Sequence, residues 1–160
     1  MRIVTIGGYG FDQATFLAAL KQNRVDTFVD IRQRRGVRGH EYAFLNSRQL
    51  QESLAKAKIR YVYLPELAPT QEIRQIQNKS DNLTKTAQRK RAELSEEFKR
   101  AYSTQILKQF KVSAFRSAAG DDARVVALFC VETHPEACHR SLAAAWLSKK
   151  LEIAVEDIVP

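Results

Sequence analysis

The sequence has few cysteines and no long hydrophobic run, and each absence excludes a class of protein. Cys130 and Cys138 are the only cysteines among 160 residues, which argues against a disulfide-stabilised scaffold. No apolar run approaches the roughly 20 residues that a transmembrane helix needs. The stretch from Met1 to Ile6 is too short for the apolar core of a signal peptide. We therefore expect a cytoplasmic protein without a membrane partner.

Internal repeats and low-complexity segments are also lacking. A length of 160 residues with a hydrophobic fraction of 44% is ordinary for one globular unit with a sizeable core. We therefore expect a single α/β domain over residues 1–160.

Positive charge is in excess and unevenly distributed. The formal net charge is +8. Residues 32–48 carry a local charge of +4, residues 65–111 another +4, and residues 112–160 a local charge of −2. Basic surface from the middle of the chain indicates an anionic partner, either nucleic acid or a phosphorylated small molecule. The same charges also fit an ordinary solvated surface.

Apolar runs and helical spacings alternate along the chain. Short strands are predicted at residues 2–6, 25–31, 59–64, 125–131 and 153–159. Between the third and fourth strands come a polar connection at 65–85 and a long basic amphipathic helix at about 86–111. This alternation favours a three-layer α/β sandwich around a mostly parallel five-stranded sheet. We expect the strand order 3-2-1-4-5, with a crevice between strands 1 and 4.

Reactive polar groups follow the fourth strand, where a helical pattern begins. Ligands of parallel α/β proteins bind at the carboxyl ends of strands, and the free N–H groups of a helix N-terminus favour anions. The candidates at this edge are Cys130, Glu132, Cys138, His139 and Arg140 after the fourth strand, Gly7 after the first, and Asp30 and Arg32 after the second.

The residue types at this edge suit acid–base and nucleophilic chemistry. Glu132 is a candidate base or nucleophile, Cys138 gains thiolate character near a helix N-terminus, and His139 transfers protons near neutral pH. We assign these three as catalytic. The remaining five bind the substrate or its anion, with the guanidinium groups of Arg32 and Arg140 suited to phosphate. The set predicts a hydrolase or transferase acting on a nucleotide-like substrate.

Other interpretations remain open at this point. In one, Asp30–Arg32 and Glu132–Arg140 are structural ion pairs that hold strand ends. In another, the protein binds nucleic acid without catalysis through loop 32–48 and the basic helix, with aromatic residues stacking on bases.

A metal site built from Cys130, His134, Cys138 and His139 is a further interpretation, because these residue types suit zinc. Their spacing matches no known zinc ribbon or finger, and adjacent residues of a helix point apart. We therefore assign no metal from the sequence, and no cofactor is indicated.

Several of these motifs together resemble the domain-of-unknown-function 488 family. The resemblance rests on Thr5-Ile6-Gly7-Gly8, Val29-Asp30-Ile31-Arg32, Tyr61 with Leu64-Pro65, and above all Cys130-Val131-Glu132 followed by Cys138-His139-Arg140. It implies a small Rossmann-like α/β protein and marks the same eight candidate residues. Many members carry His or Tyr and then Ser after the first glycine, whereas this chain has Gly8-Tyr9-Gly10.

Overall fold

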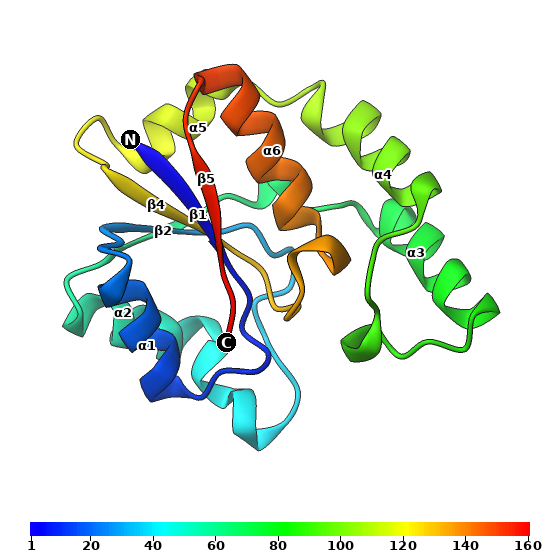
Figure 1. The fold of residues 1–160 in the computed structure, drawn as a ribbon, viewed down its shortest axis with the longest axis horizontal. Helices are drawn as coiled ribbons and strands as arrows, with labels where there is room; N and C mark the ends of the chain where they lie inside the picture. Colours follow the sequence, from blue (N-terminus) through cyan, green and yellow to red (C-terminus); the bar gives the residue numbers. More distant parts are fainter.

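The computed structural model describes residues 1–160 and shows an all-parallel five-stranded sheet between helices (Figure 1). The strands are β1 (Arg2–Ile6), β2 (Thr27–Asp30), β3 (Arg60–Tyr63), β4 (Val125–Phe129) and β5 (Val155–Ile158). The helices are α1 (Gln13–Gln22), α2 (Ser47–Lys56), α3 (Gln71–Leu83), α4 (Glu96–Tyr102), α5 (Val112–Ala119) and α6 (His139–Leu151). The predicted α/β class is confirmed. None of the helices has the length and apolarity that crossing a membrane requires.

The strand order is β3-β2-β4-β1-β5, so the predicted order 3-2-1-4-5 is wrong at its centre. β4 lies between β2 and β1 and pairs with both. All five residues of β4 are buried, as expected for the middle strand of a parallel sheet. An apolar run shows that a strand is covered on both faces, but it does not show which strands lie beside it. The pattern therefore identified β4 as central and left its neighbours undetermined.

Two hydrophobic clusters cover the two faces of the sheet. β4 supplies both, because alternate side chains of a strand point to opposite faces. Val126 and Leu128 join α5 and α6 on one face, whereas Ala127 and Phe129 join α1 and α2 on the other. The connection after β2 thus leads to one face, and the connection after β4 leads to the opposite face. The crevice that such a divergence opens lies between β2 and β4, not between strands 1 and 4 as predicted.

The segment between β3 and β4 differs from the expected polar connection and long helix. Residues 71–83 form α3, whose first turn is capped by the Thr70 hydroxyl accepting the Ile73 N–H at 3.3 Å. The next helix, α4, begins only at Glu96 and continues into a π-helical turn, Ser103–Leu107. The residues between the two helices form only a short 3-10 helix, Gln88–Lys90, and some of them bond to other segments. Leu94, for example, donates its N–H to the Glu136 carbonyl after β4 at 3.0 Å.

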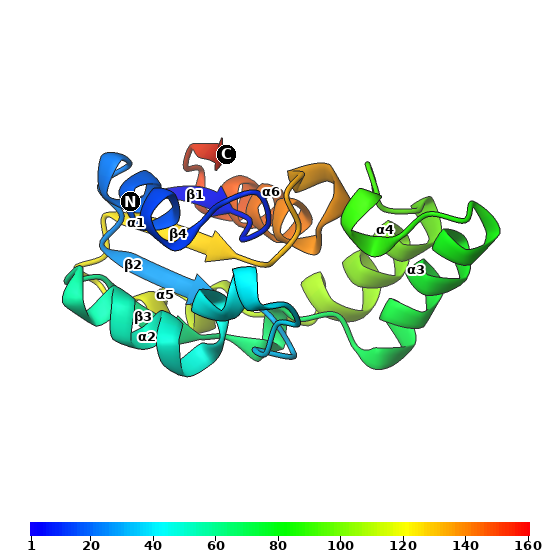
Figure 2. The same ribbon diagram turned by 90° about the horizontal axis from the view of Figure 1, so that it is seen from below.

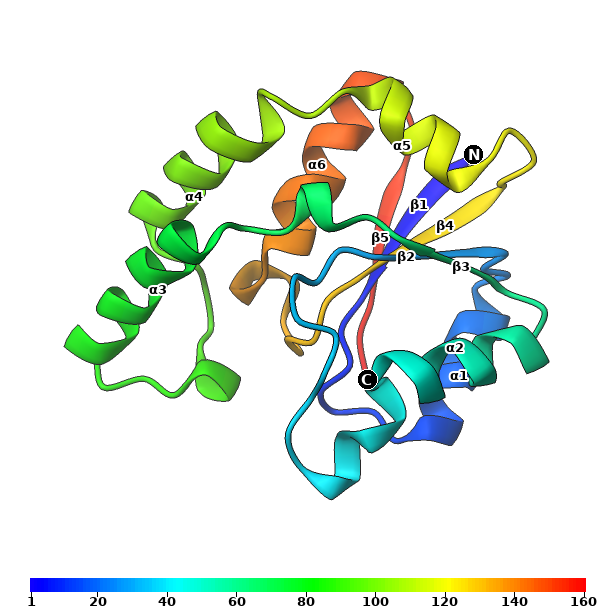
Figure 3. The same ribbon diagram turned by 180° about the vertical axis from the view of Figure 1, so that it is seen from behind.

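Helices α3 and α4 pack against each other beyond the carboxyl ends of the strands. Figure 2 shows the arrowheads of β2 and β4 pointing toward this pair, and Figure 3 shows the same pair from behind. The edge of the sheet where ligands bind in parallel α/β proteins therefore faces a helical wall.

Candidate functional site

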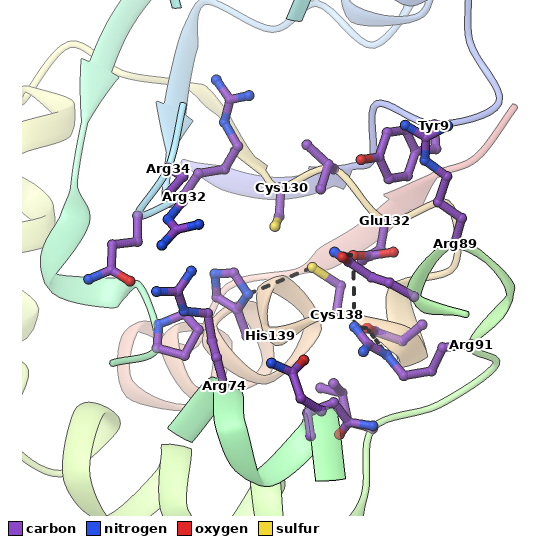
Figure 4. Close-up of a pocket in the computed structure, with 18 of the residues that line it drawn as sticks. Tyr9, Arg32, Arg34, Arg74, Arg89, Arg91, Cys130, Glu132, Cys138 and His139 are labelled. Carbon is purple, nitrogen blue, oxygen red and sulfur yellow. Dashed lines mark hydrogen bonds and ion pairs between the residues drawn. The ribbon is translucent and has the colours of Figure 1, made fainter. Parts of the chain in front are cut away.

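A cavity of about 890 Å³ lies between the carboxyl edge of the sheet and α3. Its lining comes from the loops after β1, β2 and β4, from α3, and from residues 87–94. Figure 4 shows the side chains that these segments contribute. The volume is within the range of small-molecule sites in proteins.

The lining of this cavity is strongly cationic. Seven basic side chains contribute, namely Arg32, Arg34, Arg38, Arg74, Arg89, Lys90 and Arg91. Glu132 is the only carboxylate among the lining residues. Three of the seven form salt bridges, Arg32 with Asp30, Arg89 with Glu41, and Arg91 with Asp81 and Glu132. The other four cations are left without a carboxylate partner, so the cavity has a net positive charge.

Arg74 is the least satisfied of these cations. Its Nε atom is buried and has no hydrogen-bond partner. Burial lowers the pKa of the Arg74 guanidinium, and the positive charge of Arg34 lowers it further. A guanidinium nevertheless stays protonated in proteins. Arg74 therefore keeps its charge under the unfavourable influence of a second cation, Arg34, which also lines the cavity.

Cys130, Cys138 and His139 come together at the floor of the cavity, and all three are buried. Cys138 Sγ lies 3.9 Å from His139 Nδ1 (Figure 4). The expectation that these adjacent residues point apart is wrong. Cys138 has φ −137° and ψ 142°, so it is the extended N-cap residue of α6 and not part of the helix. Helical side-chain directions therefore do not apply to it.

The other nitrogen of His139 is held by the backbone. Nε2 lies 3.1 Å from the carbonyl oxygen of Ile31. A carbonyl only accepts hydrogen bonds, so Nε2 carries a proton, and in the neutral ring Nδ1 presents its lone pair to Cys138.

The two thiols have opposite proton affinities. Burial opposes ionisation of Cys138, but the hydrogen bond from Cys130 and the charges of His139 and Arg140 bring the pKa of its thiol well below the usual value. The hydrogen bond to Cys138, followed by burial, raises the pKa of the Cys130 thiol well above the usual value. Cys138 is therefore the more acidic thiol of the pair.

Glu132 reaches the cavity from the loop after β4. Its Oε1 accepts a hydrogen bond from Gln88 Nε2 at 2.6 Å and lies 3.7 Å from Arg91 Nη2. Burial raises the pKa of Glu132 to about 7, and the negative charge of Cys138 adds to the rise, while Gln88 and Arg91 oppose it. Both protonation states of this carboxyl are accessible near neutral pH, as a general acid or base requires.

Arg140 has a different position from the one predicted. It is completely buried and does not line the cavity. Its guanidinium donates to the Thr5 hydroxyl and to the backbone carbonyls of Glu132 and Thr133. The expected ion pair with the Glu132 carboxylate does not form, because that side chain points away toward Gln88. Arg140 therefore holds the loop after β4 against β1.

Asp30 and Gly7 also lie behind the cavity wall. The Asp30 carboxylate is fully buried and accepts hydrogen bonds from Arg32 and from the Tyr61 hydroxyl. Arg32 itself lines the cavity, with its guanidinium 4.7 Å from the centre of the Phe129 ring. At Gly7, a Cβ atom would collide with the backbone carbonyl of Glu132. Of the five predicted binding residues, only Arg32 and Cys130 reach the cavity.

Sequence reasoning missed the contribution of residues 74–91. Arg74 comes from the predicted polar connection at 65–85, and Gln88 and Arg91 come from the predicted basic helix at about 86–111, yet all three line the cavity together with the cysteines. The local charge of +4 over residues 65–111 was the available signal. His134, a candidate metal ligand from the sequence, is exposed and lies outside the cavity lining.

Fold and site together define a parallel α/β protein with a cationic cavity at the carboxyl edge of its sheet. The chain belongs to the family described as Domain of unknown function DUF488, whose model matches residues 12–147. This match confirms the resemblance drawn from the sequence motifs. Comparison with curated proteins and with solved structures gives no match.

Proposed function

We propose that the protein is an enzyme, a hydrolase or transferase, that acts on a phosphorylated, nucleotide-like substrate bound in this cavity. The observation that carries the proposal is the positive charge of the cavity lining, in which seven basic side chains accompany one carboxylate and the buried Nε of Arg74 has no hydrogen-bond partner. A buried donor without a partner destabilises a protein unless a ligand accepts a hydrogen bond from it. A phosphate group carries the charge and the acceptor oxygens that two guanidinium groups bind best.

The reacting end of the substrate lies over Cys138, His139 and Glu132 in this proposal. His139 Nδ1 accepts the thiol proton of Cys138, and the resulting thiolate attacks the electrophilic atom of the substrate. The bond to the leaving group breaks as the new bond to sulfur forms, and Glu132 donates a proton to the leaving group. Water or another acceptor then loses a proton to Glu132 and displaces the sulfur, which restores the thiolate.

The proposal is tested with nucleotides, sugar phosphates and pyrophosphate as probes. Binding is measured by calorimetry at low salt, and turnover is followed by mass spectrometry of the mixture after incubation. We expect Glu132→Gln to reduce turnover by about 10² to 10⁴-fold and Cys138→Ser to reduce it at least as much, with binding largely retained. His134→Ala is the control, because His134 is exposed outside the cavity. The proposal fails if no phosphorylated probe binds, or if turnover persists in both variants.

Non-catalytic nucleic-acid binding through loop 32–48 and the basic helix is the alternative. It predicts binding of short oligonucleotides without turnover and a steep loss of affinity with salt. In the structure, Tyr9 and Tyr42 already stack with Arg89, whose guanidinium carbon lies 4.6 and 5.2 Å from their ring centres. A base would have to displace Arg89 to stack on these faces. Oligonucleotides are therefore included among the probes, at two salt concentrations.

A further inference from the structure

Three metal-ligating atoms converge at the floor of the cavity. The thiol sulfurs of Cys130 and Cys138 and a ring nitrogen of His139 all lie within 4.8 Å of one another, and all three residues are buried. Around a tetrahedral zinc ion, with Zn–S near 2.3 Å and Zn–N near 2.0 Å, neighbouring ligand atoms are about 3.6 to 3.8 Å apart. The 3.9 Å between Cys138 Sγ and His139 Nδ1 is already close to that separation.

The orientation of His139 is the one found in metal sites. A ligating histidine almost always donates its second ring N–H to a carbonyl or carboxylate, which fixes the tautomer and the ring plane. Here Nε2 faces the Ile31 carbonyl at 3.1 Å. Nδ1 is therefore left free to bind a metal, 3.9 Å from Cys138 Sγ, with Cys130 Sγ in the same cluster of ligand atoms within 4.8 Å.

Charge and donor type also favour a soft divalent ion. Two thiolates balance the charge of such an ion, so the bound cluster is neutral and suits a buried position. Thiolate and imidazole donors select zinc over magnesium or calcium, which prefer oxygen ligands. On binding, the two thiols release their protons to solvent and form two metal–sulfur bonds, while Nδ1 donates its lone pair and Nε2 keeps its proton.

We propose that Cys130, Cys138 and His139 bind one soft divalent metal ion of the zinc type. The fourth coordination position of the ion is open to the cavity. All three ligands line the cavity, so water or an anionic ligand completes the coordination. Coordination of the Cys138 sulfur by the ion prevents this sulfur from acting as a nucleophile. Metal binding therefore inhibits turnover. This inhibition rests on the proposed function, whereas the metal site itself does not.

The site is tested with cobalt(II) added to reduced, chelator-treated protein of full length. We expect one ion per chain and the intense near-ultraviolet absorption of thiolate-to-cobalt charge transfer, lost again when zinc is added. Cys130→Ser, Cys138→Ser and His139→Ala should each weaken binding by about 100-fold or more, since even changes behind the ligands reduce affinity by 10 to 100-fold. His134→Ala is the matched control and should bind like the wild type.

Absence of the charge-transfer absorption in the wild-type protein overturns the metal site, whatever the stability of the variants. The metal site is also overturned if His134→Ala abolishes binding, or if the cysteine variants keep wild-type affinity and circular dichroism shows that they are folded. The assay contains no phosphorylated compound, and the nucleotide assays use metal-free protein. Failure of one proposal is therefore distinct from failure of the other.

Discussion

Replacing Arg74 by methionine should stabilise the ligand-free protein and weaken its binding of phosphate. The two effects have one cause. In the free protein the guanidinium has a buried Nε without a partner, and the positive charge of Arg34 acts unfavourably on it. In the complex, by our proposal, the same groups bind the anion. Methionine keeps an unbranched apolar stem of similar reach and removes only the charged end.

The size of each effect follows from the contacts of Arg74. An unsatisfied buried donor destabilises a protein by about 1 to 3 kcal/mol. Since Arg74 is only partly buried, we expect the low end, a gain of about 1 kcal/mol in the free energy of unfolding. For a chain of this length, that gain raises the melting temperature by roughly 2 to 4 °C. Loss of a hydrogen bond to a charged group removes about 1.5 to 3 kcal/mol of binding free energy, which is about 10- to 150-fold in affinity.

Urea denaturation without ligand measures the first effect, and calorimetry with pyrophosphate and ADP measures the second. Lys79→Met is the matched control, because Lys79 is exposed on the same helix and does not line the cavity. The control should change stability by less than about 0.5 kcal/mol and leave affinity unchanged. If Arg74→Met destabilises the free protein, or binds both probes as tightly as the wild type, Arg74 is not an anion-binding residue and the reasoning is wrong.

Three further predictions concern groups behind the cavity. Asp30→Ala should lower the free energy of unfolding by about 3 to 5 kcal/mol, because it leaves the nearly buried Arg32 unpaired; a loss below 1 kcal/mol in urea denaturation contradicts this. Gly7→Ala should lower the melting temperature, since the added Cβ collides with a backbone carbonyl; an unchanged melting temperature contradicts the packing described. Tyr102→Phe should lower stability by about 1 kcal/mol, because the buried hydroxyl donates to the Leu67 carbonyl at 2.6 Å. Burial raises the pKa of Tyr102 well above the usual value, so the unfolded chain ionises first and wild-type stability falls as pH rises above about 10. Urea denaturation at two alkaline pH values should show a smaller fall in the Phe variant, and an equal fall refutes the assignment.

Several parts of the site could be predicted because the sequence carries them locally. An apolar run followed at once by Cys130, Glu132, Cys138 and His139 places these residues at the carboxyl end of a strand, whatever the order of the strands. All four do line the cavity. Arg140, which belongs to the same motif, could not be assigned in this way. Direction along the chain does not show whether a side chain points into a cavity or beneath the sheet.

The sequence by itself determined the α/β class, the positions of the strands and the cluster after β4, because periodicity and local composition act over a few residues. Only the tertiary structure decided the order of the central strands and the packing of α3 against the strand ends. It also decided that Arg74 of α3 lines the same cavity as Arg34, and that Cys138 Sγ lies beside His139 Nδ1. These features depend on contacts between segments far apart in the chain and on the extended backbone of Cys138, which precedes α6. Neither hydrophobic periodicity nor net charge carries that information.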